Sequence, residues 1–162
     1  MSSFDRRTLL ISLAGLAACG FEPAYGPSGA AANLRGSILV DEPTDRFSFE
    51  LLKQLEERLG QPVNPSYGLA ITLRLEEDDL AITQDQEILR YNIIGEADFA
   101  IRSLATDAEL FRGKVSSFTA YAATGTTVST REAQRDAYDR LMVILADQIT
   151  SRLIASSGSW LT

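Results

Sequence analysis

Few side chains of this protein could carry out catalysis or hold a metal. Its 162 residues include one cysteine, Cys19, and no histidine. Histidine-based acid–base catalysis, Ser-His-Asp and Cys-His triads, and zinc sites of cysteine and histidine therefore cannot be built from this chain. The single thiol, the carboxylates and the basic side chains remain as candidates.

The carboxylates are densest at residues 76–79, where Glu, Glu, Asp and Asp follow one another. Such a run could attract calcium, or two of its members could act as an acid–base pair. Successive carboxylates on a bend diverge, however, and the run lacks the glycine and the ligand spacing of a calcium loop. We interpret it as a solvated charged bend, and we predict no metal site and no catalytic residue.

Cys19 directly follows a short apolar segment. An arginine pair at residues 6–7 precedes the apolar run of residues 9–16, which is the order of a secretory signal peptide. The run is too short to span a bilayer, because a spanning helix needs about 20 apolar residues. The chain is therefore predicted to be exported.

Residues 16–19, Leu-Ala-Ala-Cys, resemble a bacterial lipobox. By that resemblance the chain is cut between Ala18 and Cys19, the Cys19 sulfur receives a diacylglyceryl group, and the new amino terminus is acylated. Two or more acyl chains anchor a protein stably, whereas one holds it only marginally. The alternative for Cys19 is a small buried hydrophobic residue.

Gly20 follows the cysteine, and lipoproteins similar in this respect are normally sent to the outer membrane, whereas aspartate there tends to signal retention at the inner membrane. We predict a lipid anchor in the inner leaflet of the outer membrane and a body that faces the periplasm. Apart from the covalent lipid, no cofactor is predicted.

The composition is that of a folded protein. With 45% apolar and 23% charged residues, wholesale disorder and a disulfide scaffold are excluded. The chain has 15 lysines and arginines against 22 aspartates and glutamates, a formal charge of −7. That sign is wrong for a protein that binds nucleic acid through a broad basic face, so no nucleic-acid partner is expected.

Hydrophobic periodicity predicts the first elements of the body. A short strand is expected over residues 34–40, and a helix over residues 46–59 that Asp45 caps. Residues 69–75 alternate between apolar and polar, as in a half-buried strand. The alternation breaks at residues 76–79, where we expect a bulge.

Two more strands and a long helix follow. The strands are expected around residues 91–101 and over residues 110–123, and a capping box at residues 129–132 opens a helix that ends before residue 156. The order β-α-β-β-β-α predicts an α+β fold, a two-layer sandwich with two helices packed on one face of a four-stranded mixed sheet. Hairpins make strands two to four antiparallel, and the first strand could pair in parallel with a later one.

The chain accordingly divides into four predicted parts. These are a lipoprotein signal peptide (1–18), a lipidated flexible tether (19–33), the sandwich domain (34–155) and a C-terminal tail (156–162).

Residues 19–26 read Cys-Gly-Phe-Glu-Pro-Ala-Tyr-Gly and closely resemble the C-G-F-x-P-x-Y-G opening of the LptE family of lipopolysaccharide-assembly lipoproteins. Residues 121–127, which lead into the last helix, match that family more loosely, and the predicted element order is similar to its two-layer sandwich. The resemblance implies a non-enzymatic protein. It implies that the chain plugs the outer-membrane barrel protein LptD, aids assembly of that barrel, binds lipopolysaccharide and helps deliver it to the outer leaflet.

A site for the phosphates of lipopolysaccharide would use arginine or lysine as donors. By strand parity, five basic side chains share the polar sheet face: Arg74, Arg90, Arg102, Arg112 and Lys114. Arg74 is expected opposite Glu96, which favours ordinary cross-strand pairing on a solvated face. Arg102, Arg112 and Lys114 have fewer expected acidic neighbours, and with Arg90 they are our candidates for binding lipopolysaccharide.

Phe118 is the apolar exception on that face, and it either makes a partner contact or turns inward at a strand end. Two other functions remain open. One is a lipid-binding auxiliary lipoprotein of another envelope transport system, with an apolar groove for acyl chains. The other is a cell-wall glycan hydrolase that uses Asp and Glu.

Overall fold

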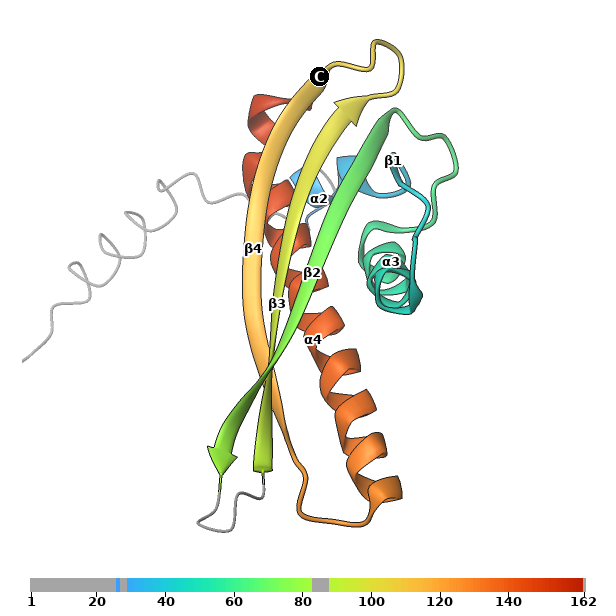
Figure 1. Cartoon of the computed structure of the whole chain (residues 1–162). Helices are drawn as coiled ribbons and strands as arrows, with labels where there is room; N and C mark the ends of the chain where they lie inside the picture. Colours follow the sequence, from blue (N-terminus) through green and yellow to red (C-terminus); the bar gives the residue numbers. More distant parts are fainter. Residues whose placement is uncertain (1–25, 27–28, 83–87, 162) are drawn as a thin grey trace, which may run out of the picture.

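A computed structural model describes residues 26, 29–82 and 88–161. The predicted signal peptide, Cys19 and most of the predicted tether lie outside the described residues (Figure 1). The described elements are α2 (Ala30–Leu34), β1 (Ile38–Val40), α3 (Arg46–Leu59), β2 (Tyr67–Ile82), β3 (Ile88–Ser103), β4 (Glu109–Ala122), α4 (Thr127–Ser156) and the 3-10 helix η1 (Ser157–Ser159).

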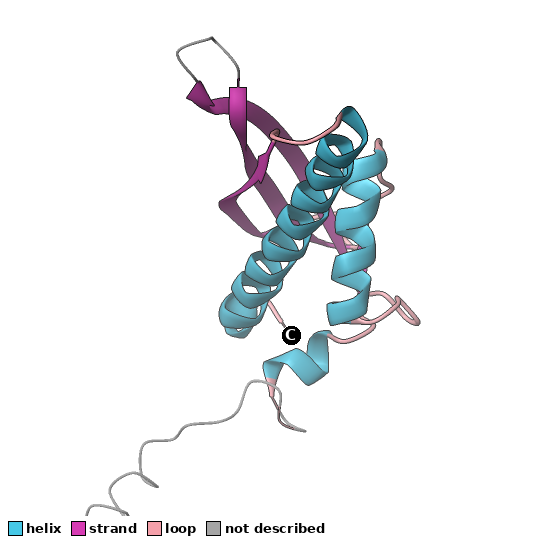
Figure 2. Ribbon diagram, turned by 90° about the horizontal axis from the view of Figure 1, so that it is seen from below, coloured by secondary structure: helices cyan, strands magenta, loops and turns pink. Residues whose placement is uncertain are grey.

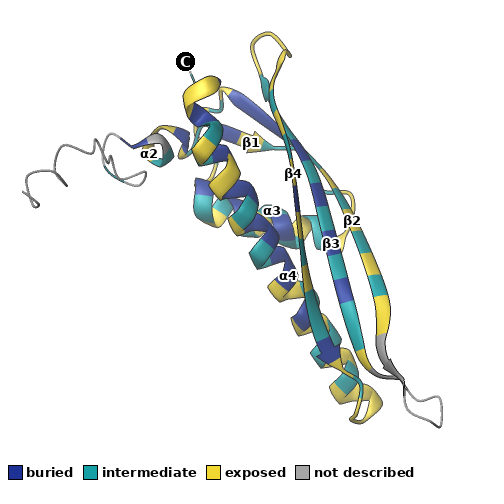
Figure 3. Ribbon diagram, turned by 90° about the vertical axis from the view of Figure 1, so that its left-hand side faces the viewer, coloured by how far each residue is buried: buried dark blue, intermediate teal, exposed yellow. Residues whose placement is uncertain are grey.

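The predicted two-layer α+β sandwich is confirmed. The sheet has the order β1-β2-β3-β4, with β1 parallel to β2 and the other pairs antiparallel. Figure 2 shows α3 and α4 side by side against one face of this sheet. Figure 3 shows buried positions along β3 and along α4, where the two layers meet. The other face of the sheet is left uncovered by helices.

Helix α3 begins and ends where the sequence predicts. The Asp45 side chain accepts hydrogen bonds from the backbone N–H of Phe47 at 2.7 Å and of Ser48 at 3.0 Å, which satisfies free donors at the helix start. Gly60 ends the helix at φ 80°, a conformation that favours glycine. The side chains of Leu51, Leu55 and Leu59 are buried in the core.

Helix α4 begins two residues before the predicted capping box, so that prediction is wrong. Thr126 is the N-cap, and its hydroxyl accepts from the Ser129 backbone N–H at 3.3 Å. The hydroxyl of Ser129 donates back to the Thr126 carbonyl at 2.9 Å. The buried apolar side chains of α4 lie in the core between sheet and helices: Ala137, Leu141, Met142, Leu145, Ala146, Ile149 and Leu153.

The first strand is shorter than predicted. Only Ile38–Val40 form β1, whereas Leu34 ends helix α2 and is fully buried. Gly36, at φ 73°, turns the chain between α2 and β1, and Ser37 donates a side-chain hydrogen bond to the Leu34 carbonyl at 2.8 Å. The stretch that we interpreted as one strand is therefore the last residue of α2, a turn at residues 35–37 and the strand β1.

The register of β2 and β3 matches the expected pairing of Arg74 with Glu96. The predicted bulge at residues 76–79 is misplaced, because β2 keeps its register through Asp79 and shifts only between Asp79 and Ile82. Side chains consequently continue to alternate between the two faces of the sheet through residues 76–79. Glu77 shares the helix-facing side with Leu73 and Leu75.

Within the stretch predicted as a tail, residues 157–159 form η1 and Trp160 is buried. The indole packs edge-on against Tyr67, with the ring centroids 5.3 Å apart. Across the described ranges, no helix is both long enough and apolar enough to cross a bilayer.

Candidate functional site

The uncovered face of the sheet carries a hollow of about 850 Å³. Ala70 and Ala100 are paired across β2 and β3, and their small side chains lower the surface at its centre. Charged side chains line much of the hollow, namely Arg74, Asp98, Arg102, Asp107, Glu109 and Arg112. Two of our candidate ligand-binding arginines, Arg102 and Arg112, therefore lie in one concavity.

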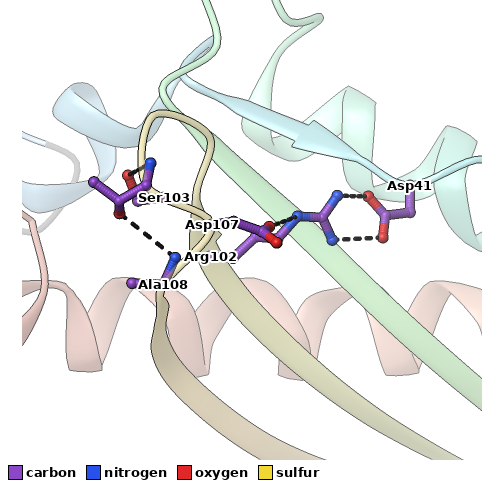
Figure 4. Close-up of polar contacts among 6 residues, drawn as sticks. Asp41, Arg102, Ser103, Asp107 and Ala108 are labelled. Carbon is purple, nitrogen blue, oxygen red and sulfur yellow. Dashed lines mark hydrogen bonds and ion pairs between the residues drawn. The ribbon is translucent and has the colours of Figure 1, made fainter.

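Arg102 forms the most extensive ion pair of this face. Its two terminal nitrogens bind the Asp41 carboxylate at 2.9 and 2.7 Å, and its Nε lies 3.6 Å from Asp107 (Figure 4). The hydrogen bond and the charge of Asp41 raise the pKa of Arg102. Gly68 leaves room for this geometry, since a Cβ there would lie 3.0 Å from the Arg102 Nε. The arginine thereby joins the end of β1 to the β3–β4 turn.

The other basic side chains of the hollow and its rim are also paired. Arg112 binds Glu109 through two hydrogen bonds, at 3.1 and 2.7 Å, and this contact raises the pKa of Arg112 and lowers that of Glu109. Lys114 donates to Glu96 at 2.8 Å. The expectation that Arg102, Arg112 and Lys114 have few acidic neighbours is therefore wrong.

Arg74 pairs diagonally with Asp98, at 2.7 Å, although it lies directly opposite Glu96. Arg90 is exposed at the far end of β3, and no ion pair joins it to another residue in the part of the chain that the structure describes. Exposed ion pairs contribute only about 0–1 kcal/mol to stability. The exposed pairs of Arg74 and Lys114, together with the local Arg112–Glu109 pair, consequently add little to the stability of the sheet.

Phe118 lies on the same face and is 68% exposed, so the alternative that it turns inward is wrong. It is paired with Ile94 on β3, which is half-buried. The two side chains form an apolar spot on β3 and β4, beyond the Lys114–Glu96 pair.

The sequence interpretation missed a polar cluster on the opposite, helix-facing side. Glu77 accepts hydrogen bonds from the hydroxyls of Tyr121 and Tyr138 and from the Gln134 side-chain amide. The Tyr138 contact is 2.8 Å, and the amide lies 3.2 and 3.1 Å from the two carboxylate oxygens. Phe47 stacks on Tyr138 with the ring centroids 4.5 Å apart. Glu77 therefore links β2 to β4 and α4, and it is not part of a solvated bend.

We expect Glu77→Ala to lower the free energy of unfolding by about 2 kcal/mol, because hydrogen bonds to a charged acceptor contribute about 1.5–3 kcal/mol and both tyrosine hydroxyls would lose theirs. Glu76 lies next in the chain but is exposed on the opposite face. Glu76→Ala is the matched control and should change stability by less than about 0.5 kcal/mol. Urea unfolding measures both variants, and equal losses would contradict a structural role for Glu77.

The same cluster predicts a loss of stability at alkaline pH. Burial, then the hydrogen bond to Glu77, raises the pKa of Tyr138 to about 12 from its ordinary 10.0, and burial and Glu77 raise the pKa of Tyr121 as well. Between pH 10 and 12 the unfolded chain releases these protons while the folded chain retains them, so stability falls as pH rises. The variant Tyr138→Phe should be less stable than the wild type at pH 7. Its free energy of unfolding should, however, fall less than that of the wild type between pH 9 and pH 11. Urea unfolding at several pH values gives the stability of both proteins. An equal loss of stability with rising pH in the variant and the wild type would contradict this assignment.

Solved structures of similar fold come from several bacteria. A lipoprotein from Caulobacter crescentus matches with a TM-score of 0.66 at 20% identity, covering 80% of this chain and 96% of that one. The rare lipoprotein B from Shewanella oneidensis matches with a TM-score of 0.57 at 15% identity, covering 75% and 95%. A minor lipoprotein from Acinetobacter baumannii matches with a TM-score of 0.53 at 18% identity, covering 74% and 89%. At these identities the matches establish the fold, a sandwich shared with bacterial lipoproteins.

The family is established by the sequence itself. The family model for LptE, described as lipopolysaccharide-assembly, matches residues 36–153. This chain belongs to the LptE family. The match covers every element from β1 to nearly the end of α4, including both faces of the sheet. Comparison with curated protein sequences finds no match.

Proposed function

We propose that this protein is a lipopolysaccharide-assembly lipoprotein of the outer membrane, anchored through Cys19, that plugs the LptD barrel and aids its assembly. It would do so without enzymatic activity, helping to deliver lipopolysaccharide to the outer leaflet. The observation that carries the proposal is the LptE-family match over residues 36–153.

The geometry of the uncovered sheet face supports a place inside a barrel. The lumen of such barrels is polar, so a protein that fills one needs a polar exterior. Arg74, Arg102 and Arg112 are each paired with a carboxylate on this face. A surface whose charges are balanced in this way can lie against a polar wall without leaving an isolated charge buried.

The alternative function, a lipid-binding auxiliary lipoprotein, predicts an apolar groove for acyl chains. The hollow on the sheet face does not fit that role, since six of its ten lining residues are charged. The interior between sheet and helices is filled by apolar side chains, including Phe99, Leu141 and Leu145. The barrel-plug function is therefore the better supported of the two.

Purification of the tagged protein from detergent-solubilised outer membranes tests the proposed partnership. We expect a barrel protein of the LptD class to copurify at equal stoichiometry, with an interface above about 1,000 Å² as lasting complexes require. Copurified phospholipid without a barrel would instead favour the auxiliary lipoprotein. Glycan cleavage that is lost on replacing one carboxylate would favour the hydrolase.

We also propose that the sheet face contacts the phosphates of lipopolysaccharide through the candidate residues Arg102, Arg112, Lys114 and Arg90. The double variant Arg112→Glu, Lys114→Glu should weaken lipopolysaccharide binding at least tenfold while the fold is kept. Arg140→Glu is the matched control, because Arg140 is an exposed arginine on α4 that also pairs with a carboxylate, that of Asp136. Equal binding by the double variant and the wild type would leave these residues as solvated ion pairs.

A further inference from the structure

Three arginines gather on the helical layer, around a hollow of about 370 Å³ between α3 and α4. Arg46 is the first residue of α3, and Arg131 and Arg135 lie about one turn apart on α4. We call these three residues the arginine cluster. All three are exposed, and among the described residues that line the hollow one is acidic, Asp139. The hollow is therefore positive, although the whole chain carries a formal charge of −7.

The charges of the arginine cluster are poorly balanced by the residues around them. Arg135 pairs with Glu132 at 3.5 Å, and both of these side chains are more than half exposed. Within the ranges that the structure describes, no ion pair joins Arg46 or Arg131 to another residue. The three arginines of the hollow on the sheet face differ, since each of them has a carboxylate partner. The arginine cluster therefore has cations to offer to an anion from outside the chain.

Helix stability does not account for an arginine at the start of α3. The N-terminal end of a helix carries a partial positive charge, which disfavours a cation in the first turn. Arg46 occupies this position, and no acidic residue follows it in that turn. The carboxylate of the preceding Asp45 already accepts hydrogen bonds from the N–H groups of Phe47 and Ser48. The position of Arg46 becomes favourable where a carboxylate from another chain binds the guanidinium group.

The other polar groups of the hollow are occupied by contacts within the body. Phe47 stacks on Tyr138 with the ring centroids 4.5 Å apart, which joins α3 to α4 beside the arginines. The Tyr138 hydroxyl and the Gln134 amide also line the hollow, and both donate to Glu77. The guanidinium groups are thus the donors that remain for a ligand. A guanidinium group binds a carboxylate through two parallel hydrogen bonds.

The arginine cluster lies on the layer opposite to the hollow of the sheet face. Helices α3 and α4 cover the other face of the sheet (Figure 2), so a phosphate held on the uncovered face does not reach the cluster. Figure 1 shows the first turns of α4, in orange, far from α2, the first described helix. In a body that fills a barrel lumen, this helical surface faces the barrel wall. Arginines without partners would be isolated charges there, which is unfavourable unless the wall supplies carboxylates.

We propose that the arginine cluster binds a carboxylate-rich segment of the barrel protein that surrounds the body. The proposal rests on the proposed function, and it names the surface and the chemistry of one contact with the barrel. Aspartate or glutamate side chains of the partner would pair with Arg46 on α3 and with Arg131 and Arg135 on α4. A contact that spans two helices would also fix how the body is rotated inside the lumen.

The double variant Arg46→Glu, Arg131→Glu tests this contact by copurification from detergent-solubilised outer membranes. We expect at least tenfold less barrel protein per copy of the variant than per copy of the wild type, because like charges would then face each other. Arg140→Glu is the matched control. Arg140 is also an exposed arginine of α4, but its side chain donates to the Ala120 carbonyl on β4 and lies outside the cluster. The control should retain the barrel as the wild type does.

A variant that keeps the charges identifies the partner groups. Arg131→Lys, Arg135→Lys introduces two amines, and carbodiimide joins an amine to a carboxylate only when the two groups are in contact. We expect mass spectrometry of the purified complex to show crosslinks from these two positions to aspartates or glutamates of the barrel. Arg140→Lys should give none to the barrel. Circular dichroism and urea unfolding establish that each variant is folded, and Arg46→Glu alone replaces the double variant if that variant does not fold.

The contact and the proposed function can fail separately. If the wild type copurifies no barrel, the partnership and the contact are both overturned. If the wild type and the double variant copurify the barrel equally, or if the crosslinks are absent, only the contact is overturned and the partnership stands. Loss of lipopolysaccharide binding by the double variant with the barrel retained would make the cluster a phosphate site, which also overturns the contact.

Discussion

Cys19→Ala should remove the protein from the outer membrane. The lipobox-like sequence places the proposed acyl chains on this one residue, and each buried methylene contributes about 0.8 kcal/mol to membrane binding. Without the cysteine the precursor should be neither lipidated nor cleaved at residue 19. Membrane fractionation should show at least a tenfold loss from the outer membrane, and mass spectrometry should show the missing acyl mass.

Cys19→Ser is a useful companion, because serine is closest to cysteine in size but offers no sulfur for the thioether. It should behave as the alanine variant does. A mature, acylated Cys19→Ala protein in the outer membrane would contradict the lipobox assignment. Whole-cell immunoblots measure the total amount of each variant. They therefore distinguish a variant that is degraded from one that is present but mislocalised.

Gly113→Val should destabilise the sandwich by about 3 kcal/mol. Gly113 lies opposite Phe99 in the β3–β4 pair, and the buried Phe99 ring fills the space above it. A Cβ at this position would lie 2.5 Å from the Phe99 Cζ, closer than non-bonded carbon atoms approach. Overpacking of this kind costs about 1–3 kcal/mol or more, because a close-packed core cannot give way. Urea unfolding should show a lower midpoint with an unchanged slope.

Gly158→Ala is the matched control, since a Cβ there meets no atom within 4 Å. It should leave stability unchanged within about 0.5 kcal/mol. Phe99→Leu should partly rescue Gly113→Val by vacating the space that the valine needs, whereas the two changes would simply add if the sites were independent. Additive losses would show that the Gly113 backbone, and not the ring above it, sets the requirement.

The fold was largely predictable, because its signals are periodic and local. The side chain of Asp45 caps α3, and Gly60 ends it, so both boundaries of that helix follow from neighbouring residues. Alternation along the strand predicted around residues 91–101 placed Ile93, Phe99 and Ile101 in the core, and the expected hairpin register placed Arg74 opposite Glu96.

The errors fall where local signals compete. Thr126 and Ser129 are both good helix caps, and the chain uses Thr126. At residues 30–34 a short helix replaces the end of the predicted tether and the first residue of the predicted strand, and Leu34 of that helix is buried in the core.

The sequence predicts which face of the sheet the candidate residues share, but it does not predict which carboxylates they bind. The sequence places Arg102, Arg112 and Lys114 on the uncovered face, yet it does not reveal their partners. Asp41 is 61 residues from Arg102 along the chain, and it meets the arginine only because β1 joins the same sheet. A carboxylate so distant is invisible to any pattern in the neighbouring residues.

Glu77 is the residue for which the sequence-based prediction and the tertiary structure differ most. Its odd number continues the inward set of Leu73 and Leu75, but the apolar alternation breaks at residues 76–79, and that break predicts a bulge. Tyr121 and Tyr138 make that position favourable by donating hydrogen bonds from 44 and 61 residues away.

The sequence alone determined the repeating pattern of apolar positions, the helix that Asp45 caps and the resemblance of residues 19–26 to the LptE opening, because each depends on residues close together in the chain. Only the tertiary structure decided which carboxylate meets which cation and which side chains donate hydrogen bonds to Glu77. Each of these depends on distances between segments that only packing of the sheet against its helices brings together.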